Sequence, residues 1–439
     1  MSISWQNRGG RIFTGIPRLW LLCLLLFLGN VSLQFVLHRH ALDNGIENRS
    51  SPSSTDTRDY IGRAENFAGG IRAGENFSKA FSQAFRDGYR TPGYPVFLAA
   101  FPPLFEKPLQ AARCAQILLS GAIVVLAFLT LRNFLRSKKK AFLGAVLVGV
   151  WPPLYYFSPI LIAESCSLFV LAALLWVLSR RSEKNLPLVP WVALPLLFAI
   201  LVYLKPNHFL LLLPVALFLW IHPTGKEKPG KIHSLSFVVL SIALLAPWSL
   251  FLSLNDGRPV LLSTASGVNL YLGTGVAQEP EDSNTLPYRF AARMGMASGS
   301  GNTAALTQNT SPQEASRIYE REALSVWSQH PVRTSLYGVA KILHGFGFSF
   351  RGLRDGVMVL LLAAALFFSV RLYRLGGPGK AWAFLFWGVL LVTIFQLFLY
   401  LPNQRLKTVL FDLPALLTLI LGILGAKSEA GSTENKKRG

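Results

Sequence analysis

Long apolar runs alternate with short basic links over most of the chain. Ten runs are long enough to cross a bilayer once tilt and local thinning are allowed: residues 16–38, 110–134, 141–162, 165–179, 187–204, 207–221, 233–254, 355–372, 381–400 and 407–425. Two longer and more polar stretches, 39–109 and 255–354, separate these runs. The pattern predicts an all-α polytopic membrane protein with about ten transmembrane helices, interfacial helices and two extracytoplasmic loop regions.

The positive charges indicate which links share a side of the membrane. The N-terminus and every second link are basic, through Arg8, Arg11, Arg18, Arg136, Lys138–Lys140, Arg180, Arg181, Lys184, Lys226, Lys228, Lys231, Arg371, Arg374, Lys380 and Lys436–Arg438. Because cytoplasmic links carry an excess of Lys and Arg, both termini are expected in the cytoplasm. Residues 92–105 are also apolar, but counting them as a span would invert every later basic link. An interfacial or re-entrant helix is expected there.

These boundaries divide the chain into six regions. They are the cytoplasmic N-terminus with the first span (1–38), a first extracytoplasmic loop (39–109), a transmembrane bundle (110–254), a second extracytoplasmic loop (255–354), the C-terminal spans (355–425) and a basic cytoplasmic tail (426–439). Apolar spacing predicts helices within the loops, over 60–68, 77–85, 318–327 and 334–343. The first run lacks a small-residue cleavage site, so we expect a retained anchor rather than a signal peptide.

Composition excludes an ordinary soluble domain. Of 439 residues, 51% are hydrophobic and only 15% are charged, and the mean hydropathy is +0.40. The net charge of +21 follows from the basic links, so nucleic acid is not an expected partner. The three cysteines, Cys23, Cys114 and Cys166, show no spacing typical of a disulfide framework or a zinc site.

The first extracytoplasmic loop carries the carboxylates best placed for chemistry. Asp56 and Asp59 come shortly before an expected helix, where Asp is also a common N-cap. A general base needs such a carboxylate near cations that hold an anionic leaving group. Lys205, Arg405 and Lys407 lie at outer helix ends, against the positive-inside pattern, and would hold a lipid phosphate there. Snorkelling of these side chains to the interface is the alternative.

Two further carboxylates have apolar neighbours. Glu164 lies in a tight outer turn, and Asp412 lies within the last span, where an acid is costly without a partner or a purpose. A structural ion pair is the alternative, with Arg405 or Lys407 as the partner of Asp412. His208 is the one histidine placed to take part in a site. No phosphate-binding glycine loop, Ser-His-Asp spacing or paired histidines are present.

Six short sequence words occur in a recognisable order: Asp56–Tyr60, Arg90–Pro95, Leu161–Glu164, Leu204–Pro206, Ser266–Gly273 and Gln329–Pro331. By these words the chain resembles the integral-membrane C-type glycosyltransferases. The group concerned is the family 39-like one, which includes the lipid A aminoarabinose transferase and the protein O-mannosyltransferases. The resemblance extends over about residues 16 to 425.

The resemblance implies a polyprenyl-phosphate-linked sugar as donor, an extracytoplasmic lipid, glycan or protein as acceptor, and inversion at the anomeric carbon. Asp56 falls on the family's catalytic carboxylate and would act as general base. Lys205, Arg405 and Lys407 would stabilise the departing phosphate. The other substrate-binding candidates are Tyr60, Arg90, Tyr94, Glu164, His208, Asn269 and Tyr271. The implied location is the bacterial inner membrane, with the active site facing outside.

The chain departs from the family in two places. Thr57 follows Asp56 where many members have Glu, so metal binding through an acidic pair does not carry over and a divalent metal stays an open question. Residues 404–407 keep positive charge but lack the family's aromatic residue. Two other functions stay open: a transporter or lipid-linked-sugar flippase, which would need ionisable groups in mid-membrane, and a non-catalytic scaffold.

The predicted topology can be tested by labelling. A single cysteine at Ser53, in a chain whose three native cysteines are replaced by Ser, should react with a membrane-impermeant maleimide in intact cells. If it reacts only after the inner face is exposed, the orientation is reversed.

Overall fold

The computed structural model describes residues 16–43, 55–102, 104–135, 137–180, 189–221, 230–275, 287, 310–348, 353–400 and 407–425. These residues form helices and their connections, and they contain no β-strand. The all-α fold expected from the apolar pattern is therefore confirmed.

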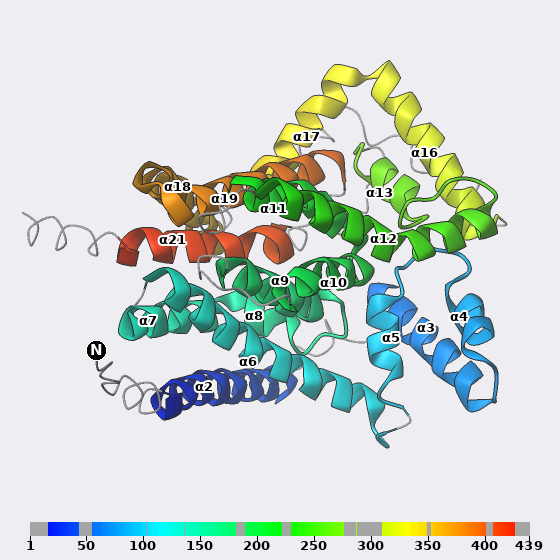
Figure 1. The fold of residues 1–439 in the computed structure, drawn as a ribbon. Coiled ribbons are helices and arrows are strands. Elements are labelled where there is room, and N and C mark those ends of the chain that lie inside the picture. The colour runs from blue at the N-terminus through cyan, green and yellow to red at the C-terminus, as the bar shows by residue number, and fades with distance from the viewer. Residues whose placement is uncertain are drawn as a thin grey trace, which may run out of the picture.

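One set of helices forms an elongated bundle (Figure 1). Its members are α2 (Ile16–Asp43), α6 (Pro108–Leu135), α7 (Lys138–Gly149), α8 (Pro152–Phe157), α9 (Glu164–Ser179), α10 (Val189–Leu204), the 3-10 helix η3 (Pro206–Leu211), α11 (Leu212–Ile221), α12 (Gly230–Asp256), α18 (Leu353–Leu375), α19 (Gly377–Leu399), the π-helix η5 (Thr408–Asp412) and α21 (Leu413–Gly425). Six of these segments are long and apolar enough to span a membrane, and three shorter apolar helices accompany them.

A second set of helices lies at the right-hand end of the bundle and above it in Figure 1. It comprises α3 (Thr55–Arg72), α4 (Phe77–Phe85), α5 (Gly93–Ala99), α13 (Ser266–Leu272), α16 (Pro312–Gln329) and α17 (Pro331–Gly345). The start of α2 and the end of α21 lie at the opposite end, where Lys140 Nζ donates to the carbonyl of Leu424 at 2.7 Å. The described helices of both polar loops thus lie away from the ends of the described chain.

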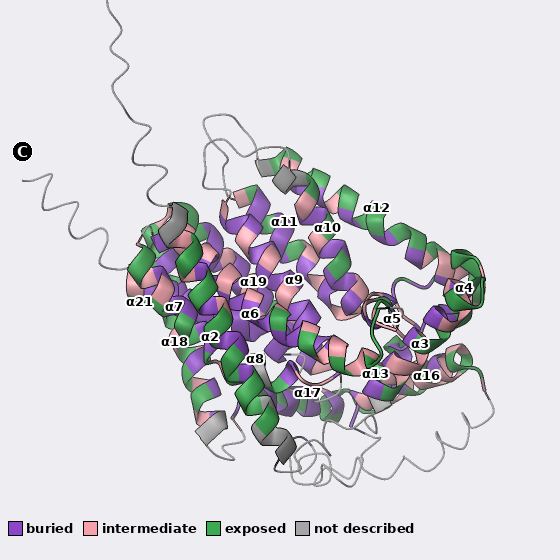
Figure 2. Ribbon diagram, turned by 90° about the horizontal axis from the view of Figure 1, so that it is seen from below, coloured by how far each residue is buried: buried purple, intermediate pink, exposed green. Residues whose placement is uncertain are grey.

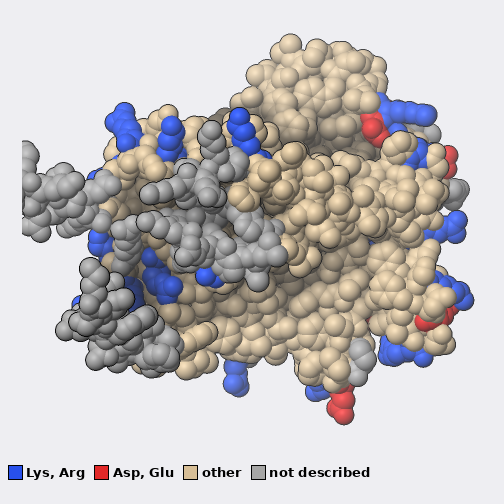
Figure 3. Space-filling view, viewed as in Figure 1, with Lys and Arg blue, Asp and Glu red and all other residues tan. Residues whose placement is uncertain are grey.

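Burial and charge follow this axis. Helices α2, α12 and α18 present exposed faces outward, whereas α9 and α21 are buried along most of their length (Figure 2). On the face seen in Figure 3 the acidic side chains all lie toward the end with α3, α4 and α16, whereas Lys and Arg lie at both ends, and few charged side chains lie in the broad middle. This distribution is that of a multi-pass membrane protein.

The expected span 141–162 is not one continuous helix. Helix α7 ends at Gly149, and the short α8 starts at Pro152, because a proline lacks the amide donor that would continue the ladder. The backbone between α8 and α9 is also unwound. Non-helical backbone at this depth needs partners within the protein. Asn30 donates to the carbonyl of Gly149 at 2.9 Å, and Gln116 on α6 donates to those of Ser158 and Ile160 at 2.9 and 2.7 Å.

The ends of other elements also differ from the sequence pattern. Helix α3 begins at Thr55, before the expected 60–68, and α16 and α17 extend beyond the expected 318–327 and 334–343. Helix α4 coincides with the expected 77–85. The last span begins with the π-helix η5, and the segment after Lys205 begins as the 3-10 helix η3. The irregular helices η3 and η5 therefore both occur at the first turns of apolar segments.

Helix α13 is held tightly against α16 and α17. A Cβ on Gly267 would collide with the carbonyl of Ser316, so only glycine permits this approach. Lys341 of α17 is fully buried and donates to the carbonyl of Gly273 at 2.6 Å and of Tyr400 at 2.8 Å. These carbonyls belong to the residues that end α13 and α19, where the helix dipoles favour a cation.

Lys341 should make stability depend on pH. Burial lowers the pKa of Lys341 from 10.5 to about 7 in the folded protein. Between these pH values the unfolded chain binds more protons, so the thermal midpoint of purified protein should rise as pH increases from about 7 towards 10. Lys341→Met should remove this rise. It should also lower the midpoint by leaving two buried carbonyls unpaired, at about 1–3 kcal/mol each.

The matched control is Lys79→Met on α4, where the ammonium is mostly exposed and pairs with Glu75 at 2.8 Å. That surface pair contributes little to stability, so the pH profile should stay unchanged. A wild-type midpoint that is flat across this pH range would show that Lys341 stays charged in the fold.

Candidate active site

Four side chains on one face of α3 begin the site. Asp56, Asp59, Tyr60 and Arg63 occupy positions i, i+3, i+4 and i+7, so they lie along the same face of the helix. Asp56 lies in the first turn, and Asp59 lies a turn further on. An N-cap position is therefore excluded for Asp59, and its carboxylate is used for contacts between segments.

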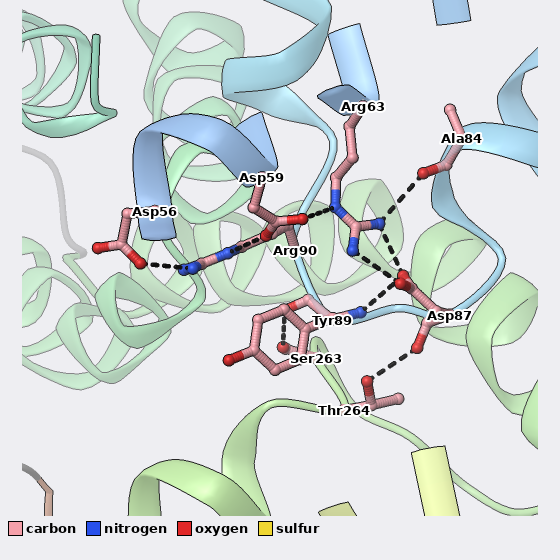
Figure 4. A network of polar contacts seen from close by, with 9 residues as sticks. All are labelled: Asp56, Asp59, Arg63, Ala84, Asp87, Tyr89, Arg90, Ser263 and Thr264. Atoms are coloured by element: carbon pink, nitrogen blue, oxygen red, sulfur yellow. Dashed lines mark hydrogen bonds and ion pairs between the residues drawn. The ribbon is translucent and has the colours of Figure 1, made fainter. Parts of the chain in front are cut away.

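Arg90 joins these carboxylates to the segment between α4 and α5 (Figure 4). Its Nη2 lies 2.5 Å from Asp56 Oδ1, and its Nε lies 2.7 Å from Asp59 Oδ2. Asp59 also accepts from Arg63 Nε at 2.9 Å, and Arg63 makes a two-point contact with Asp87 at 2.7 Å. The chain Asp56–Arg90–Asp59–Arg63–Asp87, called the Arg90 network below, fixes both carboxylates of the Asp-x-x-Asp pattern.

The surroundings of Arg90 keep its guanidinium charged. The group lies over the rings of Tyr60 and Tyr89, 5.0 and 5.1 Å from their centroids. Burial opposes the charge, but the acidic groups Tyr60 and Asp56 and the hydrogen bond to Asp59 outweigh it, and the pKa of Arg90 rises above its ordinary value. Arg90 is therefore a permanent cation beside Asp56.

The segment after α4 is fixed by the start of the second loop. Thr264 Oγ1 donates to the carbonyl of Asp87 at 2.8 Å, and the Thr264 amide donates to Gly88 at 3.0 Å. Ser263 Oγ donates to the carbonyl of Tyr89 at 2.9 Å (Figure 4). The two extramembrane regions therefore build one site together.

Helix α5 packs against the end of α10. A Cβ on Gly93 would lie 2.6 Å from the carbonyl oxygen of Tyr203, so glycine is required at this contact. Tyr94 is fully buried, donates to Gln116 Oε1 at 2.5 Å, and packs edge-on against Tyr60 at 5.0 Å. Tyr94 thus supports Tyr60 from behind.

Lys205 follows α10 and pairs with Glu164, the first residue of α9. The distance from Nζ to Oε1 is 2.8 Å, and the Glu164 side chain is 1% exposed. His208 is fully buried in η3, with Nδ1 3.2 Å from the carbonyl oxygen of Lys205. Glu164 therefore positions the ammonium of Lys205, since a buried carboxylate of this kind requires a cation.

A cavity of about 700 Å³, the donor cavity below, opens beside these groups. Its polar lining includes Asp56, Tyr60, Arg90, Lys205, Arg258, Asn269 and Glu320. Its apolar lining includes Phe209, Leu210, Leu261, Leu262 and Phe395. Phe209, Leu210 and Phe395 belong to helices of the bundle, so the cavity combines apolar side chains of the bundle with the charged groups named above.

The structure separates the sequence-predicted residues into three groups. Asp56, Tyr60, Arg90, Lys205 and Asn269 line the donor cavity. Tyr94, Glu164, His208 and Tyr271 are buried outside its lining, and Tyr271 packs on Tyr319 with ring centroids 5.1 Å apart. Arg405 lies outside the described residues.

Lys407 is placed differently from Lys205. Its Nζ lies 2.9 Å from Asp412 Oδ1 and 2.9 Å from Met358 Sδ, and both charged side chains are at most 3% exposed. Trp151 Nε1 also donates to Asp412, at 3.3 Å. The ion pair weighed for Asp412 on sequence grounds is therefore present, and Lys407 does not line the donor cavity.

Two charged residues of the cavity were not foreseen. Arg258 pairs with Asp256 at 2.7 Å and lies 3.8 Å from Glu320 of α16. Arg258 follows a span at the end expected to face outside, so like Lys205 it departs from the positive-inside pattern, and the sequence alone carries that signal. Glu320 gives no such signal, because nothing in its helical neighbours indicates the cavity.

The carboxylates do not form a metal site. Asp56 and Asp59 are both engaged by Arg90, and among the residues that the structure describes no three His, Cys, Asp or Glu side chains come together as ligands. Asp56 and Asp59, held by a cation, do not fit the role of ligands to a divalent metal ion.

Residues 89–251 match a family model described as dolichyl-phosphate-mannose-protein mannosyltransferase. The matched stretch is less than half of the chain; it includes Arg90, Glu164 and Lys205 but not Asp56 or Asn269. Comparison with curated proteins and with solved structures gives no match. The family match and the all-α fold bear out the resemblance of this membrane protein to the C-type glycosyltransferases.

Proposed function

We propose that the protein transfers a sugar from a polyprenyl-phosphate donor to the hydroxyl of an extracytoplasmic lipid, glycan or protein, with inversion at the anomeric carbon. The observation that carries this proposal is the mixed apolar and charged lining of the donor cavity. A lipid phosphate needs an apolar wall for its chain and cations for its head group, and the cavity offers both beside Asp56.

Asp56 is the proposed general base. As the acceptor oxygen forms its bond to the anomeric carbon, Asp56 takes the hydroxyl proton, and the bond from that carbon to the phosphate oxygen breaks. The electron pair of that bond leaves with the polyprenyl phosphate. Arg90, fixed between Asp56 and Asp59, orients the base and offsets the negative charge around it.

Lys205 and Arg258 are the proposed phosphate-stabilising cations within the described residues, and Arg405 remains a further candidate. Cations that face the developing charge of a leaving phosphate lower the barrier most when they are positioned beforehand. Glu164 and Asp256 provide this positioning through ion pairs of 2.8 and 2.7 Å. Tyr60 and Asn269 complete the wall around the sugar.

We propose that the cavity faces the outside of the bacterial inner membrane. The basic links of the sequence alternate in phase with the spans, and the donor cavity lies at the end of the bundle that carries the two long loops. A polyprenyl-linked donor and an acceptor of the cell envelope would both be available on that side.

A transporter or flippase is the alternative function. It would require ionisable groups on a path through the middle of the membrane. Lys407 and Asp412 form a buried ion pair with each other, and the cavity beside Asp412 is only about 10 Å³. That volume cannot admit a substrate, so this pair does not favour transport.

Lys205 and Glu164 should be tested as a pair. Lys205→Gln alone leaves the buried Glu164 without its cation and should reduce protein abundance. Glu164→Gln with Lys205→Gln should restore abundance. If Lys205 holds the donor phosphate, the double variant still loses a charge-assisted contact of about 1.5–3 kcal/mol, which raises the KM for the donor about ten- to a hundredfold.

The matched control is Asp412→Asn with Lys407→Gln, an equally buried ion pair outside the donor cavity. This variant should change thermal stability without changing the KM for the donor. Equal donor use by the Glu164→Gln, Lys205→Gln variant and the wild type would mean that Lys205 has a structural role only.

Asp56→Asn tests the base directly. The amide keeps the size of the side chain and an oxygen that can accept from Arg90, but it cannot take a proton. Sugar transfer by the purified variant should fall about a hundredfold to ten-thousandfold, with little change in stability.

Asp59→Asn is the comparison, because Asp59 shares Arg90 with Asp56 but does not line the donor cavity. It should keep most of the activity. Wild-type turnover by Asp56→Asn, or a larger loss in Asp59→Asn, would remove Asp56 from the proposed role.

A further inference from the structure

A second cavity lies beyond the Arg90 network. It has a volume of about 900 Å³ and is bounded by α3, α4, the end of α12 and the start of α16. Arg63, Ala84 and Asp87, drawn in Figure 4, are part of its lining. Its volume is within the range of pockets that hold small ligands.

The two cavities share two ion-paired walls. Arg90 lines the donor cavity and bonds Asp59, which lines the second cavity. On the other side, Arg258 of the donor cavity bonds Asp256, which lines the second cavity and also pairs with Arg317 at 2.9 Å. A molecule in the second cavity would therefore lie next to the base, on the far side of these walls from the donor.

The lining of the second cavity excludes several kinds of ligand. Gly62 and Ala84 are its only non-polar residues among those described, so no large apolar side chain lines it to receive a lipid chain. The cations Arg63 and Arg317 are paired with Asp59, Asp87 and Asp256. The third cation of the lining, Arg86, is balanced by the fourth carboxylate, Glu314, so the lining carries no excess positive charge to attract an anion.

Planar amides remain as binding groups. Asn66, Gln83, Asn255 and Gln313 line the second cavity. Gln83 donates to Glu75 at 3.2 Å and Asn255 donates to the carbonyl of Phe251 at 2.7 Å, so Asn66 and Gln313 are the two best able to meet a ligand. Asn66 is exposed and makes no side-chain hydrogen bond within the described part of the chain, and Gln313 makes only a long one, of 3.4 Å, to the carbonyl of Arg86. Each amide offers a donor and an acceptor side by side, which matches neighbouring hydroxyls of a sugar.

We propose that the second cavity binds the acceptor, and that the part of the acceptor held there is an uncharged saccharide. This inference rests on the proposed glycosyl transfer. A saccharide in this position would lie beside Asp59, one Arg90 contact away from Asp56, so its reacting hydroxyl would have to extend past Arg90 to reach the base. A peptide acceptor would need apolar pockets that the lining lacks.

Binding to purified protein in lipid nanodiscs tests the inference without an activity assay. The neutral probes are maltotriose, mannotriose and chitotriose, the peptide probe is acetyl-Ala-Thr-Ala-amide, and undecaprenyl phosphate reports on the donor cavity. We expect at least one trisaccharide to bind. Asn66→Ala with Gln313→Ala should weaken that binding about tenfold, since each lost neutral hydrogen bond costs a few-fold. It should leave undecaprenyl phosphate binding unchanged.

Gln329→Ala is the control, because it removes the same kind of amide from the exposed end of α16, outside both cavities. Binding of no trisaccharide, binding of the peptide instead, or equal trisaccharide binding by the double variant and Gln329→Ala would overturn the inference. If the wild type does not bind undecaprenyl phosphate, that result counts against the proposed donor. Failure of the acceptor inference and failure of the proposed function can therefore be told apart.

Discussion

The ion contacts of Arg90 are the interaction on which the site depends. Two carboxylates one helical turn apart, Asp56 and Asp59, would repel each other without a cation between them. Arg90 removes this repulsion and attaches α3 to the segment that leads into α5. The same contact directs Asp56 towards the donor cavity and leaves Asp59 towards the second one. One guanidinium therefore positions the base and separates the two cavities.

The site is also anchored in the membrane bundle. Tyr60 packs on Tyr94, Tyr94 donates to Gln116, and Gln116 donates to the unwound backbone between α8 and α9. Buried polar groups are stable only when all of them are bonded, so this chain of contacts specifies one arrangement. The unwound backbone after α8 thus bonds Gln116 of α6, and Gln116 in turn holds Tyr94 and helix α5 in place.

The sequence was sufficient for the apolar segments and for much of the cavity. Periodicity and charge predict the helices, and the resemblance identifies Asp56, Arg90, Lys205 and Asn269, all of which line the donor cavity. The sequence could not show which face of a short helix lines the cavity. Asn269 and Tyr271 are two residues apart on α13, about 200° around the helix, so Asn269 reaches the cavity while Tyr271 packs on Tyr319. Glu320 is brought to the cavity by packing of α16, which no local pattern encodes.

The cations of the donor cavity are partly buried, and partial burial of a positive charge is costly before substrate binds. Each has a carboxylate partner: Asp56 and Asp59 for Arg90, Glu164 for Lys205, and Asp256 for Arg258. These pairs offset the cost of desolvation in the empty protein. A guanidinium has five N–H donors, and Arg258 uses Nε for Asp256, so donors remain with which it can meet a phosphate. The charges are thus stable at rest and still able to stabilise an anion that forms during transfer.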